Sequence, residues 1–189
     1  MVVFDTTCLL HLLDPNLGAP LNPQTKSPVG QVHARVKYLV ERLHENREKI
    51  IIPAPVLGEL LILAERAGAE YFAKIDKSAA FKIEPFDSRA AVELSIITAG
   101  AIKAGDKKAG STATIAKIKF DRQIVAIAKV LGASTIYTND ENLTKFAEAN
   151  GLTAVAVWDL PLPEQERQAT FWDVPEGEQN GELGETGRP

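Results

Sequence analysis

The chain has a single cysteine and no long run of apolar residues. One thiol, that of Cys8, excludes an internal disulfide and a zinc site built from several cysteines, so a reducing cytoplasm is the expected compartment. The apolar stretches fall well short of the roughly 20 residues that a membrane-spanning helix requires. The residues after Met1 form no basic leader. We therefore expect a cytoplasmic protein with no membrane segment and no secretion signal.

Histidine is also scarce. The three histidines, His11, His33 and His44, share no spacing that is typical of a metal site or of acid–base catalysis. The overall composition is that of a globular protein: 45% of the 189 residues are hydrophobic and 24% are charged. This composition excludes intrinsic disorder over most of the length and predicts about one folded domain.

Acidic residues are concentrated at the end of the chain. Residues 161–189 hold seven acids and two arginines, a charge of −5, which leaves residues 1–160 at +1. Residues 177–189 are almost devoid of apolar side chains, so folding them would not offset the loss of conformational entropy. We expect a folded domain over residues 1–160 and a flexible acidic tail over residues 161–189.

Short apolar runs alternate with helical patterns along the folded part. Strands are expected at residues 2–4, 49–52, 81–86, 134–138 and 153–158. Helices are expected at residues 28–43, 55–64, 88–103, 121–132 and 141–150. Residues 14–27, which contain three prolines, are expected to form a long inserted loop. This order predicts a three-layer α/β/α domain with a central, mostly parallel sheet.

Four acidic residues are expected to meet at one edge of that sheet. Asp5 follows the first strand and Asp140 follows the fourth, and Glu59 and Asp121 lie in or near the first turns of helices at the same end. Four carboxylates in one cleft require a cation, because like charges raise one another's pKa. Oxygen ligands without clustered His or Cys favour Mg²⁺ or Mn²⁺. Two such ions would activate a water for phosphodiester hydrolysis.

At these positions the sequence resembles the PIN-domain nucleases, including the VapC-type toxins of toxin–antitoxin pairs. The matching segments are VVFDTTCLL, PAPVLGELL, FDRQIVAIAKVLGA and STIYTND, in the family's order over residues 1–160. The resemblance implies a Mg²⁺- or Mn²⁺-dependent endoribonuclease that is a homodimer, acts on RNA and has an antitoxin as partner. Its implied metal-binding and catalytic acids are Asp5, Glu59, Asp121 and Asp140, and its implied supporting residues are Thr6, Thr138 and Asn142. The inserted loop and the acidic tail exceed a minimal family member, which leaves a different partner or substrate open.

Basic residues gather just before Asp121 and its expected helix. Residues 103–122 carry a local excess of four positive charges. The expected RNA-binding residues are Lys107, Lys108, Lys117, Lys119 and Arg122. Cations of this kind neutralise phosphates and position a strand. The alternative is an ordinary solvated loop, and Phe120 is the single aromatic residue there, so base stacking has little support.

The four acids can also be explained without a metal, by structural roles. Asp5, Asp121 and Asp140 precede helical segments and could act only as helix N-caps. Glu59 lies among apolar residues, where a buried and unpaired acid is costly, so a cation or an arginine partner is expected.

Two other function classes compete with the nuclease. A receiver-like signalling domain that binds Mg²⁺ would need an acidic pair after the first strand and a lysine after the last, but Asp5 is followed by Thr6 and the last strand ends near Trp158 and Asp159. A catalytically silent nucleic-acid-binding or protein-interaction module on the same fold would not need the complete acid set.

Overall fold

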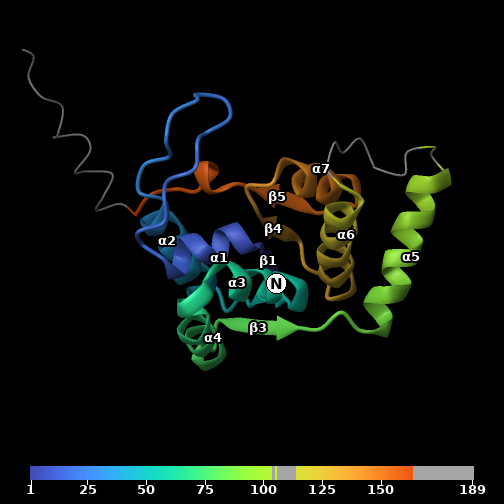
Figure 1. Cartoon of the computed structure of the whole chain (residues 1–189), viewed down its shortest axis with the longest axis horizontal. Helices are drawn as coiled ribbons and strands as arrows, with labels where there is room; N and C mark the ends of the chain where they lie inside the picture. The colour runs from blue at the N-terminus through green and yellow to red at the C-terminus, as the bar shows by residue number, and fades with distance from the viewer. Residues whose placement is uncertain (104, 106–113, 164–189) are drawn as a thin grey trace, which may run out of the picture.

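A five-stranded parallel sheet forms the centre of the computed structural model, which describes residues 1–103, 105 and 114–163 (Figure 1). The strands are β1 (Val2–Phe4), β2 (Ile50–Pro53), β3 (Phe81–Glu84), β4 (Thr135–Tyr137) and β5 (Thr153–Val155). Their order is β3-β2-β1-β4-β5 and every pair is parallel. The predicted α/β architecture is therefore confirmed, with β1 as the central strand from which the strand order runs in both directions.

The central strands are the most deeply buried part of the molecule. Every residue of β1 and β2 is buried, as expected for strands covered on both faces. The Phe4 ring meets the Tyr137 ring edge to face, with 5.3 Å between centroids, and so packs the end of β1 against the end of β4. This pair fixes the two strand ends that carry the candidate site.

Seven α-helices lie in the described part of the chain. They are α1 (Thr6–Leu13), α2 (Val32–Glu45), α3 (Ala54–Leu63), α4 (Gly68–Lys77), α5 (Ser88–Lys103), α6 (Ile115–Val130) and α7 (Glu141–Ala149). Two 3₁₀ turns, η1 (Glu65–Ala67) and η2 (Val157–Asp159), complete the elements. Helix α1 packs against α2 and α3, and α6 packs against α5 and α7. No helix of this part is long and apolar enough to cross a membrane.

Two of these helices were not predicted from the sequence. Helix α1 begins directly after β1, because the carboxylate of Asp5 accepts a hydrogen bond from the N–H of Thr6 and caps it. Helix α4 follows the 3₁₀ turn η1, so no loop separates it from the preceding helical pattern. Neither helix is preceded by a loop that would have marked its start in the sequence.

The prediction that a helix begins at Pro28 was wrong. Pro28 instead forms an antiparallel bridge with Leu21, and the N–H of Val29 donates to the carbonyl of Pro20 at 2.9 Å. Helix α2 starts only at Val32, after Gln31 adopts a left-handed conformation with a φ of 54°. The inserted loop therefore extends beyond residue 27 and has its own hydrogen bonds.

The prediction that Asp121 opens a helix was also wrong. Helix α6 begins at Ile115, and Thr114 caps it by accepting a hydrogen bond of 3.3 Å from the N–H of Lys117. Asp121 therefore lies nearly two turns inside α6, given about 3.6 residues per turn. The N-cap explanation does not apply to this aspartate, and its burial needs another reason.

Candidate metal and catalytic site

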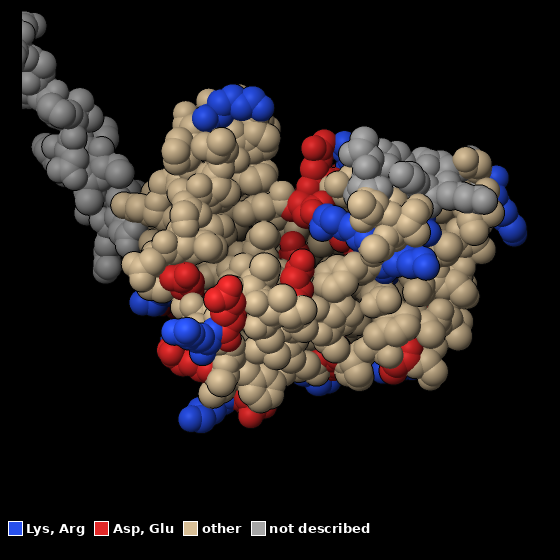
Figure 2. Space-filling model, in the orientation of Figure 1, with Lys and Arg blue, Asp and Glu red and all other residues tan. Residues whose placement is uncertain are grey.

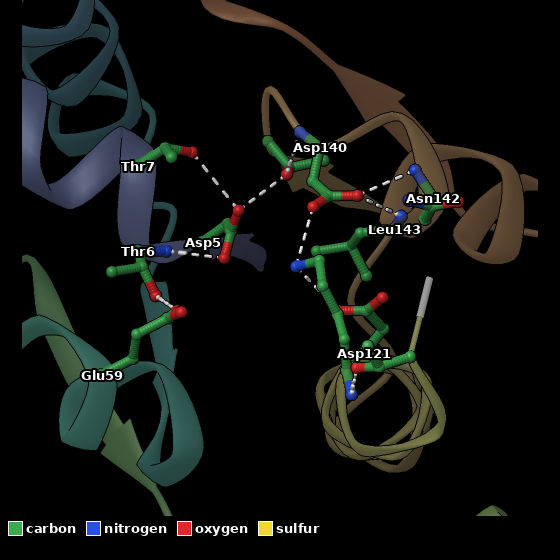
Figure 3. A network of polar contacts seen from close by, with 11 residues as sticks. Asp5, Thr6, Thr7, Glu59, Asp121, Asp140, Asn142 and Leu143 are labelled. Atoms are coloured by element: carbon green, nitrogen blue, oxygen red, sulfur yellow. Dashed lines mark hydrogen bonds and ion pairs between the residues drawn. The ribbon is translucent and has the colours of Figure 1, made fainter. Parts of the chain in front are cut away.

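All four predicted acids line one small pocket at the carboxyl end of β1 and β4 (Figure 3). The pocket has a volume of about 90 Å³. Its lining consists of Asp5, Thr6, Thr7, Glu59, Leu63, Lys117, Phe120, Asp121, Asp140 and Leu143. The strand order reverses between β1 and β4, the position at which open α/β sheets bind their ligands. Figure 2 shows acidic side chains gathered in the hollow of this face, with basic side chains beside them over α6.

Asp5 is held by hydroxyl and amide donors on both carboxylate oxygens. Its Oδ1 accepts from the N–H of Thr6 at 2.7 Å, and its Oδ2 accepts from the hydroxyls of Thr138 at 2.7 Å and Thr7 at 3.3 Å. Only 6% of the residue is exposed. Burial raises the pKa of Asp5 above its ordinary value, against the hydrogen bonds from Thr138 and Thr6, which lower it. Asp5 does cap α1, but its second oxygen faces the pocket network.

Asp140 uses its two oxygens differently. Oδ1 accepts from the N–H groups of Asn142 at 2.8 Å and Leu143 at 3.0 Å and so caps α7. Oδ2 lies 2.8 Å from Nζ of Lys117. Burial tends to raise the pKa of Asp140, but the hydrogen bonds from Lys117, Leu143 and Asn142 outweigh it and hold this pKa below its ordinary value. The cap alternative is therefore correct for one oxygen and leaves the other for a cation.

Glu59 reaches the pocket from α3. The hydroxyl of Thr6 donates a hydrogen bond to its Oε2, which links the start of α1 to α3. This contact, rather than an arginine, is what the structure places beside Glu59. Thr6 thus binds one acid through its side chain and Asp5 through its backbone.

Asp121 is a second buried acid with a raised pKa. It is 4% exposed, and burial raises the pKa of Asp121 to about 6, with the nearby Lys117 opposing the change. Nζ of Lys117 lies 3.7 Å from its Oδ1. The lysine's own pKa is raised, because the hydrogen bond to Asp140 and the charge of Asp121 outweigh its burial. An ammonium group therefore stands among the carboxylates.

The side chains that line the pocket are of the chemical types that bind a hard divalent cation. They offer carboxylate and hydroxyl oxygens and no sulfur or imidazole, as Mg²⁺ and Mn²⁺ prefer. In the arrangement of the described residues, however, no three His, Cys, Asp or Glu side chains are positioned to bind one ion together. The carboxylates of Glu59 and Asp140 are turned to Thr6 and Lys117 instead. The residue types fit the metal, whereas their present contacts are those of hydrogen bonds and ion pairs.

Of the expected RNA-binding residues that the structure describes, Lys117 lines the acid pocket, Lys119 is exposed and Arg122 is buried. Arg122 is buried, with 7% exposed, and its guanidinium lies 5.5 Å from the centroid of the Phe146 ring, so in this structure the side chain packs in the interior rather than toward solvent. Lys119 is exposed, about 200° around α6 from the pocket-lining Lys117. Lys107 and Lys108 lie outside the described residues.

Sequence reasoning missed two features of the pocket. Thr7 contributes a hydroxyl to Asp5, and its place directly after an acid and a threonine was the available signal. Lys117 was taken only as a phosphate contact. Its four-residue spacing from Asp121 would have indicated an ion pair if the helix had been known to begin at Ile115.

The comparisons with known proteins identify the family of the chain. The model of the PIN domain family matches residues 32–149, more than half of the chain, and this range contains Glu59, Asp121 and Asp140. The chain therefore belongs to the PIN-domain family, as the sequence resemblance predicted. Among curated proteins, none matches the chain in sequence.

Solved structures with a similar fold include two VapBC structures and the toxin VapC20. VapBC2 from Rickettsia felis, bound to a DNA fragment from the promoter, has a TM-score of 0.52 at 16% identity over 82% of this chain and 98% of its own. VapC20 from Mycobacterium tuberculosis, a toxin that cleaves the sarcin–ricin loop, has a TM-score of 0.51 at 16% identity over 82% and 98%. DNA-bound VapBC from Salmonella typhimurium has a TM-score of 0.51 at 19% identity over 82% and 97%. At these identities the likeness shows the fold.

Proposed function

We propose that the chain is a metal-dependent endoribonuclease that hydrolyses RNA phosphodiester bonds. The observation that supports this most is the single pocket of about 90 Å³ that Asp5, Glu59, Asp121 and Asp140 share at the point where the strand order reverses. Membership of the PIN-domain family supports it independently. Two of the acids, Asp5 and Asp121, are buried with raised pKa values, which is the state that a bound cation would relieve.

The four acids would hold Mg²⁺ or Mn²⁺, and Thr6 and Thr138 would orient them. When bound, the ion supplies positive charge that activates water and stabilises the charge of the phosphodiester as it is displaced. The hydroxyl of Thr138 keeps Asp5 Oδ2 in place, and the hydroxyl of Thr6 keeps Glu59 turned toward the pocket. Burial of Asp5 and Asp121 excludes bulk water from their side of the pocket.

RNA would be drawn to the pocket by the basic residues before and along α6. Lys119 is exposed there, and Lys107 and Lys108 belong to the same basic stretch of sequence, residues 103–122. Phosphate contacts of this kind position a strand without reading its sequence. Lys119 projects from α6 away from the pocket-lining Lys117, so it would hold a phosphate of the strand outside the pocket, beside the acids rather than over them.

A cleavage assay tests the proposal. The purified full chain with Mn²⁺ or Mg²⁺ is expected to cleave single-stranded or structured RNA, and EDTA is expected to stop it. Asp5→Asn and Asp121→Asn should each lower the rate by more than about 100-fold, since losses of up to this size follow changes even in the residues that support a metal site. Glu70→Gln, an exposed acid on α4 paired with Lys74, is the control and should keep wild-type activity. Undiminished cleavage by Asp5→Asn would refute the assignment.

We further propose that the nuclease is the toxin of a toxin–antitoxin pair and forms a homodimer. Two of the solved structures of the same fold are VapBC assemblies, so a partner protein encoded beside this chain is the first one to seek. A small neighbouring gene whose product has a DNA-binding N-terminus, co-purifies with the chain and abolishes RNA cleavage would support the pair. Light scattering of the isolated chain would test the dimer.

One observation favours a second candidate, a catalytically silent binding module. In the described part of the chain, no three acids are positioned to bind one ion, and an ammonium group lies among them. Such a module would bind RNA or protein without cleavage in any divalent metal. The same assay separates the two candidates.

A further inference from the structure

Lys117 lies in the first turn of α6 and its side chain lines the acid pocket. Its Nζ lies 2.8 Å from Oδ2 of Asp140 and 3.7 Å from Oδ1 of Asp121. The lysine is one turn before Asp121 on the same helix, so both side chains project toward the pocket from the same face. A single ammonium group therefore contacts two of the four carboxylates that the proposed function assigns to a metal.

The oxygen that Lys117 contacts is the one that a metal would need. Oδ1 of Asp140 already accepts two backbone N–H groups at the start of α7. Only Oδ2 remains for a cation, and the ammonium group of Lys117 is bonded to it. A divalent ion at this oxygen would stand within a few ångströms of the ammonium group, and the repulsion between the two cations would oppose its binding while Lys117 stays in place.

The ammonium group of Lys117 can also move out of the pocket. Its side chain is 44% exposed, and a lysine has a flexible four-carbon stem, so the ammonium can swing into solvent without disturbing α6. Among the residues that line the pocket, it is the sole cation. It neutralises part of the acid cluster in the absence of metal and can be displaced when metal arrives.

We propose that Lys117 is an intramolecular counter-ion that competes with the divalent metal for Asp140 and Asp121 and thereby sets the metal concentration at which the site loads. This inference rests on the metal site of the proposed function. The lysine acts on the metal through the two acids, so it is a positioning residue rather than a catalytic one. Removing its ammonium should tighten metal binding, because the displacement step and the repulsion between the two cations both disappear.

Calorimetric titration of the metal-free full chain with MnCl₂, without RNA, tests the inference. Lys117→Met is expected to bind Mn²⁺ about fivefold tighter or more, from the loss of a partly exposed ion pair. Lys117→Arg, which keeps the charge, is expected to bind Mn²⁺ no tighter than the wild type. Lys145→Met is the matched control, because Lys145 pairs with Glu141 at 2.6 Å beside the site and its removal changes the net charge equally. This control should stay within about twofold of the wild type.

Melting temperatures give a second readout that a purely structural role would not reproduce. In EDTA, Lys117→Met should melt below the wild type because the acids lose their counter-ion, and Mn²⁺ should raise its melting temperature more than that of the wild type. If Lys117 had only a structural role, Lys117→Met would lower the melting temperature by the same amount in EDTA and in Mn²⁺. Lys117→Gln, which keeps a polar side chain on this exposed helix position, serves the same comparison if Lys117→Met does not fold.

The outcomes separate the inference from the function on which it rests. Equal Mn²⁺ affinities for Lys117→Met and Lys145→Met, or weaker binding by Lys117→Met, would overturn the counter-ion role alone. Failure of the wild type and of every variant to bind Mn²⁺ would overturn the metal site and the counter-ion role together. Binding by Lys117→Met where the wild type shows none would support the competition in its strongest form.

Discussion

The hydroxyl of Thr138 donates a hydrogen bond of 2.7 Å to Oδ2 of Asp5 and accepts one of 3.0 Å from the N–H of Asp140. Thr138 follows β4, and Asp5 follows β1, so a single hydroxyl joins the ends of the two strands between which the strand order reverses. Thr138 is 1% exposed. It therefore positions two of the proposed metal-binding acids and has no contact with bulk water.

Replacement of Thr138 by valine should weaken both stability and activity. The change keeps the shape of the side chain but leaves a buried carboxylate and a backbone N–H each without one partner, which costs about 1–3 kcal/mol of unfolding free energy. Cleavage should fall by about 10–100-fold, as for residues that orient metal ligands. Urea unfolding and an RNA cleavage assay measure the two effects.

Thr135→Val is the control for that prediction, since Thr135 lies on β4, three residues before Thr138, and its hydroxyl is hydrogen-bonded to the exposed hydroxyl of Ser134. It should change the unfolding free energy by less than about 0.5 kcal/mol and leave cleavage intact. Equal effects of the two valine variants would show that Thr138 has no special role.

The stability of the metal-free protein should depend on pH through Asp121. The pKa of this acid is raised from 3.8 to about 6 by burial, so the folded state binds its proton more tightly than the unfolded state. The stabilisation is present below pH 4 and is lost as the pH rises through 6. Asp121→Asn does not titrate, so in EDTA its stability relative to the wild type should rise by up to about 3 kcal/mol between pH 4 and pH 8.

Urea unfolding of both proteins in EDTA across this pH range measures the difference. Asp5 is present in both, so its titration largely cancels. A difference that stays constant from pH 4 to pH 8, or that runs in the opposite direction, contradicts the raised pKa.

Cys8 should be unreactive in the native protein. Its side chain is buried at 0% exposure, and burial raises the pKa of the thiol, with the charge of Asp5 adding to the effect. A thiol reagent such as DTNB should therefore label no group in the folded chain and one group in guanidinium chloride. Rapid labelling of the native protein would mean that α1 opens readily.

Salt should weaken RNA binding through the basic residues of α6. If Lys119 contacts a phosphate, Lys119→Ala should reduce the steepness of log K against log salt by about 0.7 for single-stranded RNA. Filter binding in EDTA, where no cleavage is expected, measures the slope. Lys82→Ala, on the edge strand β3 and paired with Glu84, should leave the slope unchanged.

The sequence predicted the sheet and most helices because burial imposes strong local patterns. Strands with fully apolar residues, such as β1 and β2, were located within a residue, and the helix Ser88–Lys103 was found because Asp87 caps it by accepting a 2.9 Å hydrogen bond from the N–H of Ala90. The same kind of signal was misleading at Pro28 and at Asp121, where no helix begins. Ser27 and Pro28 look like a helix start, but Pro28 pairs with Leu21, a contact between residues that local patterns do not relate.

The acid set was recognisable in the sequence because carboxylates that follow parallel strands meet at one edge of the sheet. Local residue types therefore determined the α/β domain and the gathering of Asp5, Glu59, Asp121 and Asp140 in one pocket. Only the tertiary structure decided the contacts of the individual side chains. Thr138 holds Asp5, Lys117 stands among the acids, and Arg122 packs over Phe146. These contacts join residues from different elements, and their geometry depends on how whole helices pack against the sheet rather than on any pattern along the chain.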